Sequence, residues 1–345
     1  MTSIRMLRGW TTALVLFIDS GWAARDGARG TSRPVTLRSI FRWTIVVAGA
    51  LLFAQSIRFV GLDAIAAGLG RVGSGFAIIL LLSGAREVAR AIAWTRTVEG
   101  PAPLRLLPAF RARLAGEALN TLLPMGIVVG EPTKASHVAG EIPFATAFSA
   151  LVVELAFYSA SLVLLFGSGL LSLAVLNTAS IGPFAAAFLA VAGIVSVLIL
   201  AGKRWSGPLG DRIFGFARRH PDRVGAIVAC EVAYHALAVA EVYVTLLLIS
   251  PVRPTVGAAV VLETVNRFVT MAFKMLPMRV GVDEVGSSIF AARVDLNPAT
   301  GLTLALIRKI RLLFWSAIGL ALFEVDLRVP ARRTTQRTQR PQSLG

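Results

Sequence analysis

Long runs of apolar residues, separated by short polar stretches, extend over most of the chain. Six of them can each cross about 30 Å of hydrocarbon as a helix that rises about 1.5 Å per residue. The predicted spans are residues 41–60, 75–94, 143–167, 181–201, 224–250 and 300–323. Two further apolar segments, 116–140 and 255–298, are interrupted by proline, glycine and several charged residues. The pattern predicts an all-helical membrane protein with two unusual segments.

The composition supports the same class of protein. Of the 345 residues, 55% are hydrophobic and 16% are charged, whereas soluble proteins carry about 25% charged residues. The net charge of +16 does not indicate nucleic-acid binding, because the basic residues lie between apolar runs and not on one face. Cys230 is the single cysteine, which excludes an intrachain disulfide and a cysteine metal cluster. We expect no metal and no cofactor.

The distribution of basic residues predicts the orientation of the spans. Basic residues collect at 1–42, 95–116, 202–223 and 324–345, with net charges of +5, +3, +4 and +3. Because Lys and Arg beside spans remain in the cytoplasm, these stretches and both termini are predicted to be cytoplasmic. Segment 116–140 must then enter and leave from the cytoplasmic side, and 255–298 from the outer side. This predicts two re-entrant broken helices in an inverted-repeat arrangement; a pair of short complete spans is the alternative.

The two ends of the chain flank a membrane domain at residues 41–323. Residues 10–18 are apolar but too few to span a membrane, so 1–40 is predicted to be a basic cytoplasmic or interfacial arm. A cleaved signal peptide is the alternative, but Asp19 and the absence of a clean cleavage site argue against it. Residues 324–345 are predicted to be a disordered basic tail that lies near anionic headgroups.

The two broken segments share a sequence pattern. In each, an acid stands three residues before an asparagine, and a proline stands seven residues before a second acid. These residues are Glu117, Asn120, Pro124 and Glu131 in the first copy and Glu263, Asn266, Pro277 and Glu284 in the second. We expect each proline to end a half-helix and the glycines Gly126, Gly130 and Gly281 to permit the reversal. Such breaks in two inverted halves indicate a transport site; two unrelated proline kinks are the alternative.

Further residues carry a resemblance to a known family. They are Arg86, Arg90 and Trp94 in the second span, Val153 and Glu154 in the third, and Arg308 in the last. With the broken segments, they resemble the transmembrane domain of lysylphosphatidylglycerol synthases, also called flippase-like membrane proteins, over about residues 75–323. The resemblance implies a lipid-translocating bundle with inverted re-entrant halves. Only the polar tail follows the last span, so we expect the synthase activity to be absent. Residues 125–129 depart from the Gly- or Arg-rich sequence that is common in the family.

Ionisable residues within the membrane are the candidates for the substrate site, because their burial costs about 2.5–3.5 kcal/mol on insertion scales. The candidates are Arg86, Lys134, Arg267 and Arg308, the acids Glu117, Glu131, Glu263, Asp283 and Glu284, and the amides Asn120 and Asn266. We expect the basic residues, with Lys274, to hold a lipid phosphate. Arg90 and Arg311 could instead extend to the membrane surface.

The acids are expected either to balance the arginines or to exchange protons. Glu263 and Arg267 stand four residues apart and can pair within one helix. Glu154 is expected to be a structural partner, whereas Glu131 and Glu284, at the repeat breaks, are expected to act as gates or proton carriers.

Glu231 and His235 also stand four residues apart, in the fifth predicted span. A hydrogen-bonded contact between helices is favoured over a proton relay. It is also favoured over a metal site, because two ligands on one helix are too few.

The sequence thus predicts a protein that moves an amphipathic, anionic lipid between the leaflets of a bacterial cytoplasmic membrane. It contains no Gly-rich nucleotide loop, serine elbow or zinc motif, and we expect no enzymatic activity. Two alternatives stay open. One is a lipid-modifying transferase that uses Glu131 or Glu284 as a general base. The other is a non-transporting partner that presents lipid to a separate lipid- or envelope-biosynthesis enzyme.

Overall fold

The computed structural model describes residues 62–123, 126–176, 208–273, 277–279 and 281–328, together with four single positions between 47 and 58. The chain divides into two units after Ile45, and all described residues belong to the second unit. The arm 1–40, the predicted spans 41–60 and 181–201, Pro124, Lys274 and the tail after Arg328 lie outside the described residues.

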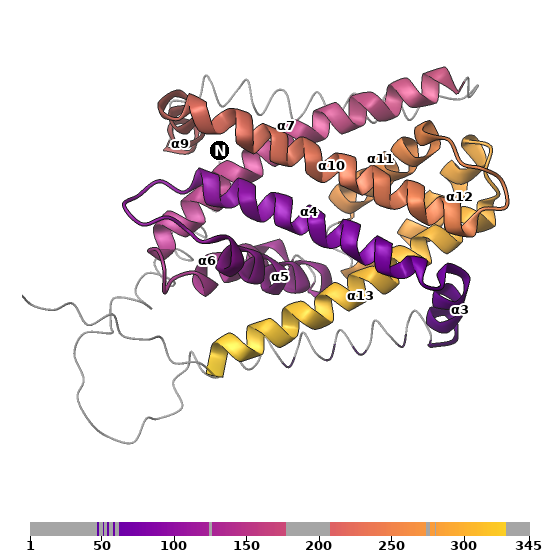
Figure 1. Cartoon of the computed structure of the whole chain (residues 1–345), viewed down its shortest axis with the longest axis horizontal. Helices are drawn as coiled ribbons and strands as arrows, with labels where there is room; N and C mark the ends of the chain where they lie inside the picture. The colour runs from indigo at the N-terminus through magenta and orange to yellow at the C-terminus, as the bar shows by residue number, and fades with distance from the viewer. Residues whose placement is uncertain are drawn as a thin grey trace, which may run out of the picture. The chain divides into compact units, whose positions relative to one another are not determined.

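The described residues form helices and connecting loops, without strands (Figure 1). The helices are α3 (Leu62–Val72), α4 (Gly75–Thr97), α5 (Leu106–Leu122), α6 (Ile127–His137), α7 (Phe144–Val175), α9 (Pro208–Arg219), α10 (Pro221–Ile249), α11 (Val256–Ala272), the 3-10 turn η1 (Pro277–Arg279), α12 (Val282–Arg293) and α13 (Pro298–Arg328).

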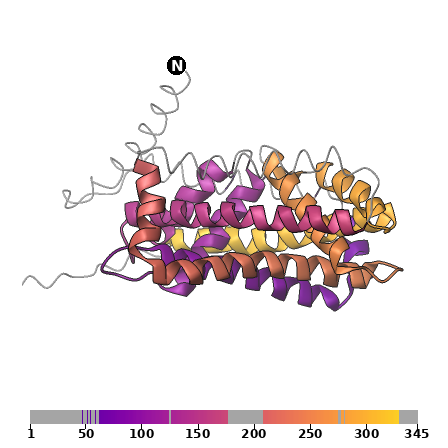
Figure 2. The same cartoon turned by 90° about the horizontal axis from the view of Figure 1, so that it is seen from above.

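Four long helices make up the bundle. α4 and α10 lie side by side and run in opposite directions; α7 runs with α10, and α13 with α4 (Figures 1 and 2). α7 and α10, of 32 and 29 residues, are long and apolar enough to cross a membrane. Ala66–Val72 and Gly75–Thr97 would make a third span if this pair, bent by 95°, is one span. The spans predicted at 143–167 and 224–250 are therefore found as apolar helices, each longer than predicted.

Both predicted broken segments consist of two short helices. α5 and α11 have 17 residues each, about 25 Å at the usual rise and at the lower limit for a membrane-spanning helix. α6 and α12 follow with 11 and 12 residues. The α5–α6 pair lies toward the end of the bundle where α4 ends, and the α11–α12 pair toward the end where α10 ends (Figures 1 and 2). α5 packs on α4, α6 and α13, and α11 packs on α10, α12 and α7.

The breaks differ from the sequence-based expectation. α11 ends at Ala272, five residues before Pro277, so that proline does not end the helix. It begins the η1 turn instead, in which Met278 has φ +51°. Gly281, with φ +88°, does use the conformational freedom of glycine. Gly126 does not, because its φ of −53° is open to any residue.

The glycines of the first break permit close packing rather than a reversal of the chain. A Cβ on Gly126 would lie 2.6 Å from Asn120 Cα, and one on Gly116 would lie 2.7 Å from the carbonyl oxygen of Gly130. Gly130 would meet the Asn120 side chain in the same way. α5 and α6 therefore approach each other at a distance that only glycine allows.

Two helices occur where loops were expected. α3 occupies most of the connection at 61–74, in which the charges of Asp63 and Arg71 cancel, and α9 lies in the basic stretch 202–223. α9 is amphipathic: Phe216 is fully buried against α7 and α10, while Arg212 and Arg218 are exposed. The net charge of the stretch 202–223 gives no indication of this apolar face.

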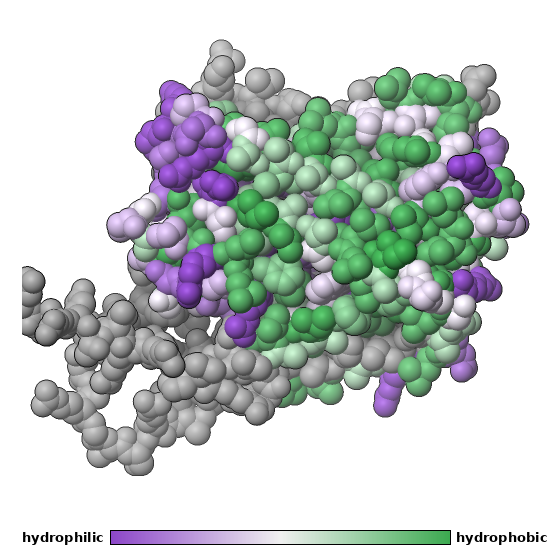
Figure 3. Space-filling view, viewed as in Figure 1, coloured by the Kyte–Doolittle hydropathy of each residue, from purple (hydrophilic) through white to green (hydrophobic). Residues whose placement is uncertain are grey.

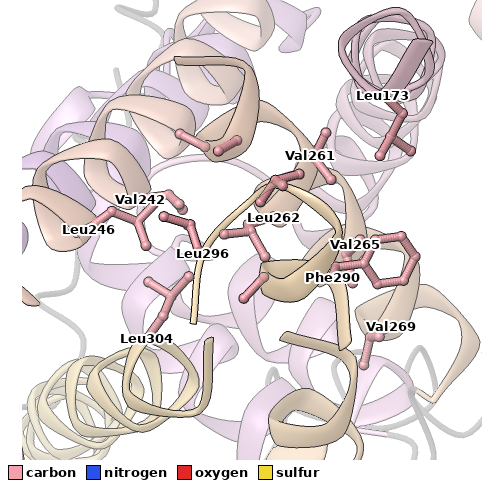
Figure 4. Packing of buried hydrophobic residues seen from close by; sticks show 14 residues of the cluster. Leu173, Val242, Leu246, Val261, Leu262, Val265, Val269, Phe290, Leu296 and Leu304 are labelled. Atoms are coloured by element: carbon pink, nitrogen blue, oxygen red, sulfur yellow. The ribbon is translucent and has the colours of Figure 1, made fainter. Parts of the chain in front are cut away.

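The apolar core gathers around the broken segments. Leu173, Val242, Leu262, Phe290 and Leu304 join α7, α10, α11, α12 and α13 in one cluster (Figure 4). A second cluster, which includes Trp94, Leu104, Ala135 and Ile142, lies around α5 and α6. On the face shown in Figure 3, apolar side chains cover the middle of the bundle and hydrophilic ones gather toward its two ends. Such a surface suits a lipid bilayer.

Close glycine contacts make one stability prediction. A Cβ on Gly319 of α13 would lie 2.8 Å from Ala118 Cβ and closer still to the Leu114 carbonyl oxygen of α5. We expect Gly319→Ala to cost about 1–3 kcal/mol through overpacking, seen as a lower midpoint of thermal unfolding in detergent. Gly225→Ala in α10, where no atom lies within 4 Å, is the matched control and should keep or raise the midpoint. Equal effects of the two changes would contradict the close packing of α13 on α5.

Candidate functional site

Charged side chains of the described residues form four groups of ion pairs in the interior of the bundle. Together we call them the buried charge network. Its members are Arg86, Glu87, Arg90, Arg113, Glu117, Glu131, Lys134, Glu154, Glu241, Glu263, Arg267, Arg279, Asp283, Glu284, Arg308, Lys309 and Arg311. Each acid of the network lies within 4 Å of an arginine or lysine nitrogen. Lipid offers no water to solvate a charge, so the helices supply partners to one another.

Tyr234 of α10 lies at the centre of the network. The guanidinium carbons of Arg86, Arg267 and Arg90 lie 4.8, 5.1 and 5.5 Å from the centre of its ring. Arg86 also donates a hydrogen bond of 3.2 Å to the Tyr234 hydroxyl. A ring face attracts cations, so one tyrosine helps to hold three arginines from α4 and α11 together.

Two arginine pairs near Tyr234 each share one carboxylate. Glu241 accepts from Arg86 at 2.6 Å and from Arg311 at 3.0 Å. Glu263 accepts from Arg267 at 2.7 Å and lies 3.5 Å from Arg308. The pairing of Glu263 with Arg267 that the sequence predicted is confirmed.

Arg90 has the most complete pairing of the central arginines. Its Nε and Nη2 donate to the two oxygens of Glu154 at 2.8 and 2.9 Å, a bidentate contact between α4 and α7. Arg113 of α5 approaches the same carboxylate at 3.5 Å. We call Arg86, Arg90, Arg267, Arg308 and Arg311 the arginine cluster; its five guanidinium groups share the three carboxylates of Glu154, Glu241 and Glu263.

Some N–H donors of the arginine cluster have no hydrogen-bond acceptor, or only a weak one. The Nε atoms of Arg86 and Arg311 are buried and have no hydrogen-bond partner among the described residues. Arg308 has the weaker acceptors Ser287 Oγ and the Leu262 carbonyl, at 3.3 and 3.2 Å. The arginine cluster therefore has N–H groups that can donate to additional anionic oxygens, such as those of a phosphate group.

The first broken segment brings together its predicted residues. Lys134 Nζ donates to Glu117 at 2.6 Å and to Glu131 at 2.7 Å, and Asn120 donates to Glu131 at 3.1 Å. The Lys134 side chain is 1% exposed, whereas that of Glu117 is 34% exposed. We call Glu117, Asn120, Glu131 and Lys134 the first latch; it ties α5 to α6.

The second broken segment has an equivalent arrangement with a different source of the lysine. Lys309 of α13 lies 2.8 Å from Glu284 and 3.8 Å from Asp283. Arg279 of η1 lies 3.3 Å from Asp283. Glu284 also accepts from the Gly281 amide at 2.8 Å and thereby caps α12. We call Arg279, Asp283, Glu284 and Lys309 the second latch.

Some of the other predicted residues have different contacts from those that the sequence predicts. Asn266 donates to Glu263 at 3.0 Å and not to Glu284, so the two asparagines have different partners. The guanidinium groups of Arg90 and Arg311 pair with buried carboxylates and do not extend to the membrane surface. Lys134 donates two of its three N–H groups to carboxylates.

Sequence reasoning missed several members of the network. Arg113 was counted among the charges of a cytoplasmic stretch, but it is 0% exposed and contacts Glu87 at 3.1 Å. Its spacing of four residues before Glu117 was the available signal. Lys309 and Tyr234 are not among the residues that the sequence predicts for the site. No spacing rule connects Tyr234 to arginines on α4 and α11.

His235 makes a contact between helices, as favoured from the sequence. Its Nε2 lies 2.9 Å from Ser161 Oγ of α7, and its ring stacks on Tyr158 at 5.6 Å. Glu231 is not its partner, because neither carboxylate oxygen of Glu231 has a hydrogen bond among the described residues. In the described part of the chain no three His, Cys, Asp or Glu side chains are grouped so that they could hold a metal.

Comparison with known proteins adds one finding. A family model described as the lysylphosphatidylglycerol synthase TM region matches residues 40–319. No curated protein and no solved structure matches the chain.

The pairing of Arg90 with Glu154 makes a prediction about stability. Arg90→Gln leaves a buried carboxylate short of its main partner, and we expect a loss of about 3–5 kcal/mol, measured by unfolding in detergent. Arg105→Gln, which removes a pair with Glu141 whose arginine is exposed, is the control and should hardly change the unfolding midpoint.

A double variant tests whether the loss comes from the unpaired charge. Arg90→Gln combined with Glu154→Gln removes both charges and should recover part of the lost stability. If the double variant is as unstable as the sum of the single ones, the two residues do not stabilise the bundle as a pair.

Proposed function

The chain belongs to the family of the lysylphosphatidylglycerol synthase TM region, and on this basis we propose that it moves a phospholipid between the leaflets of a bacterial cytoplasmic membrane. The matched residues 40–319 include every described helix except the end of α13, residues 320–328. The name of the family suggests that the protein handles lipid.

The arginine cluster is the observation that carries the proposal. Five guanidinium groups share three carboxylates, and two of their buried N–H donors have no partner among the described residues. A phosphate group would supply the missing acceptors and the missing negative charge. The acyl chains would stay in the bilayer beside the apolar surface while the headgroup contacts the cluster. The substrate is therefore proposed to be an anionic phospholipid.

The broken helices are proposed to give access to the cluster from each side in turn. We infer that α4–α7 and α10–α13 are inverted repeats, since α5 and α11 have equal lengths and corresponding packing partners. The first latch lies in one re-entrant half and the second latch in the other. Opening one latch while the other stays closed would expose the arginine cluster to one leaflet only, as alternating access requires.

The proposed orientation follows from the two ends of the bundle. The loops between α4 and α5 and between α9 and α10 lie at one end, and the loop between α10 and α11 lies at the other (Figures 1 and 2). The described basic residues of the loop before α5 and of α9 belong to the first end, which we propose to lie in the cytoplasm with both termini. Segments 41–60 and 181–201 complete the six proposed spans.

A transferase reading has less support. It needs Glu131 or Glu284 as a free general base. Glu131 accepts from Lys134 and Asn120, and Glu284 is engaged by Lys309 and by the amide of Gly281. These contacts favour a structural or gating role for both acids. A partner that only presents lipid would not need arginines with unused donors in its interior.

Lipid movement can be tested in liposomes that contain a trace of fluorescent anionic phospholipid. Dithionite should quench more than half of the label when the wild-type protein is present, because lipid from the inner leaflet reaches the outside. Arg86→Gln and Arg308→Gln each remove one guanidinium from the arginine cluster, and we expect at least a tenfold slower rate, which corresponds to about 1.4 kcal/mol. Arg105→Gln on the exposed loop is the control and should keep the wild-type rate. Quenching that stops at half for the wild type would refute lipid movement.

The orientation can be tested with single cysteines in a Cys230→Ser background. We expect Pro101→Cys, in the loop before α5, to react with a membrane-impermeant maleimide only from the cytoplasmic side. Arg253→Cys, in the loop before α11, should react only from the outer side. Labelling of both positions from one side would overturn the inverted arrangement.

A further inference from the structure

Glu231 of α10 is a buried acid outside the buried charge network. It is 0% exposed, and neither of its carboxylate oxygens has a hydrogen-bond partner among the described residues. Every acid of the network has a cation within 4 Å, but none is found this close to Glu231 in the described part of the chain. Burying an unpaired carboxylate is costly, whereas the protonated acid is neutral. Among the described residues, the surroundings of Glu231 therefore favour the protonated acid over the carboxylate.

A base with a free lone pair lies one helical turn further along α10. Ser161 Oγ donates its single proton to the Tyr158 carbonyl at 2.7 Å, so it accepts at 2.9 Å from His235 Nε2. The other ring nitrogen, Nδ1, is then an unprotonated acceptor, and it is buried without a partner among the described residues. An acid with a proton and a base without one thus share one side of α10.

The surroundings of Glu231 combine an apolar shell with nearby charges. Its neighbours in sequence, Ile227 and Cys230, pack in a cluster with Ala93 of α4, Val153 and Phe157 of α7 and Phe216 of α9. The charged groups that face it from other helices are Glu87 and Arg90 of α4, Arg113 of α5 and Glu154 of α7. Besides His235, the titratable groups of α10 nearby are Cys230 and Tyr234.

Two of these facing groups are able to change partners. Arg113 has its Nε and Nη1 without hydrogen bonds, although it lies 3.5 Å from Glu154 and 3.1 Å from Glu87. Arg90 belongs to the arginine cluster and is bound to Glu154. A negative charge on Glu231 would attract both guanidinium groups away from Glu154, and a proton on Glu231 would release them.

We propose that Glu231 is a proton-binding site and that a proton accompanies each lipid that this chain moves. The inference deepens the proposed function and rests on it. With Glu231 protonated, the charges of Arg90 and Arg113 are balanced by Glu154 and Glu87 but not by Glu231, which favours a lipid phosphate in the arginine cluster. With Glu231 ionised, one carboxylate more competes with that phosphate. Lipid and proton therefore favour each other's binding, and the coupling is reciprocal. The proton leaves as the lipid leaves, and His235 Nδ1, one turn further along α10 and without a partner among the described residues, is the acceptor that we propose for it.

The coupling is tested with full-length protein in liposomes that contain fluorescent anionic phospholipid and an entrapped pH dye. An imposed pH gradient, with valinomycin and potassium to clamp the voltage, should change the rate of wild-type lipid movement at least fivefold. We expect Glu231→Gln, which mimics the protonated acid, to remove this response and to reduce proton flux to that of protein-free liposomes. Asp63→Asn, an exposed acid on α3, is the matched control and should respond like the wild type. A gradient response that survives in Glu231→Gln overturns the coupling.

Infrared spectroscopy tests the proton-binding site without transport. The wild type in lipid nanodiscs should show the carbonyl stretch of a buried protonated carboxylic acid, and Glu231→Gln should lose this band while Asp63→Asn keeps it. If the band is unchanged in Glu231→Gln, the site is refuted. If the wild type moves no lipid, the proposed function fails and the coupling with it, whatever the band shows. If the wild type moves lipid without a response to the gradient, only the coupling fails.

Discussion

The need to pair charges inside a lipid-facing bundle governs this structure. A charged side chain in hydrocarbon cannot be solvated, so each one has to find its partner on another part of the protein. Arg90 and Glu154 satisfy each other between α4 and α7, and Arg86 and Glu241 do so between α4 and α10. Removing either member would leave its partner buried and unpaired. These pairs therefore fix which helices are neighbours more strictly than apolar packing can, since lipid chains compete with apolar contacts between helices.

The ratio of acids to cations differs between the parts of the buried charge network. At the two latches, carboxylates equal or outnumber the cations: Lys134 contacts two acids, and Lys309 and Arg279 share two more. Around Tyr234, arginines outnumber the carboxylates. Opposite charges in a low-dielectric interior attract strongly, so an anionic group would be drawn to the arginines in the middle of the bundle. Such a distribution favours binding of an anion at the centre.

The sequence predicted the class of fold and most residues of the interior, because each rests on a local signal. The apolar runs indicated the helices, and the matched spacings of Glu117 and Asn120 and of Glu263 and Asn266 indicated the two broken segments. Contacts between distant segments had no such signal. No spacing in the sequence connects Lys309 with Glu284 or Arg86 with Tyr234. Arg113 was assigned to a cytoplasmic stretch because a count of charges carries no information about burial. The role of Gly126 was also misjudged, since a sequence does not distinguish a glycine that turns the chain from one that lets two helices touch.

Two helices connect the separate parts of the network. On α4, Arg86 pairs with α10, Glu87 with α5 and Arg90 with α7. On α13, Arg308 pairs with α11, Lys309 with α12 and Arg311 with α10. Three contacts to three different helices arise within about one and a half turns in each case. A small displacement of α4 or α13 therefore cannot break one pair alone; it has to exchange all three sets of partners together. Because intermediate positions would leave buried charges unpaired, these helices are expected to occupy a few discrete positions rather than a continuous range, which is the property that a gated passage for lipid needs.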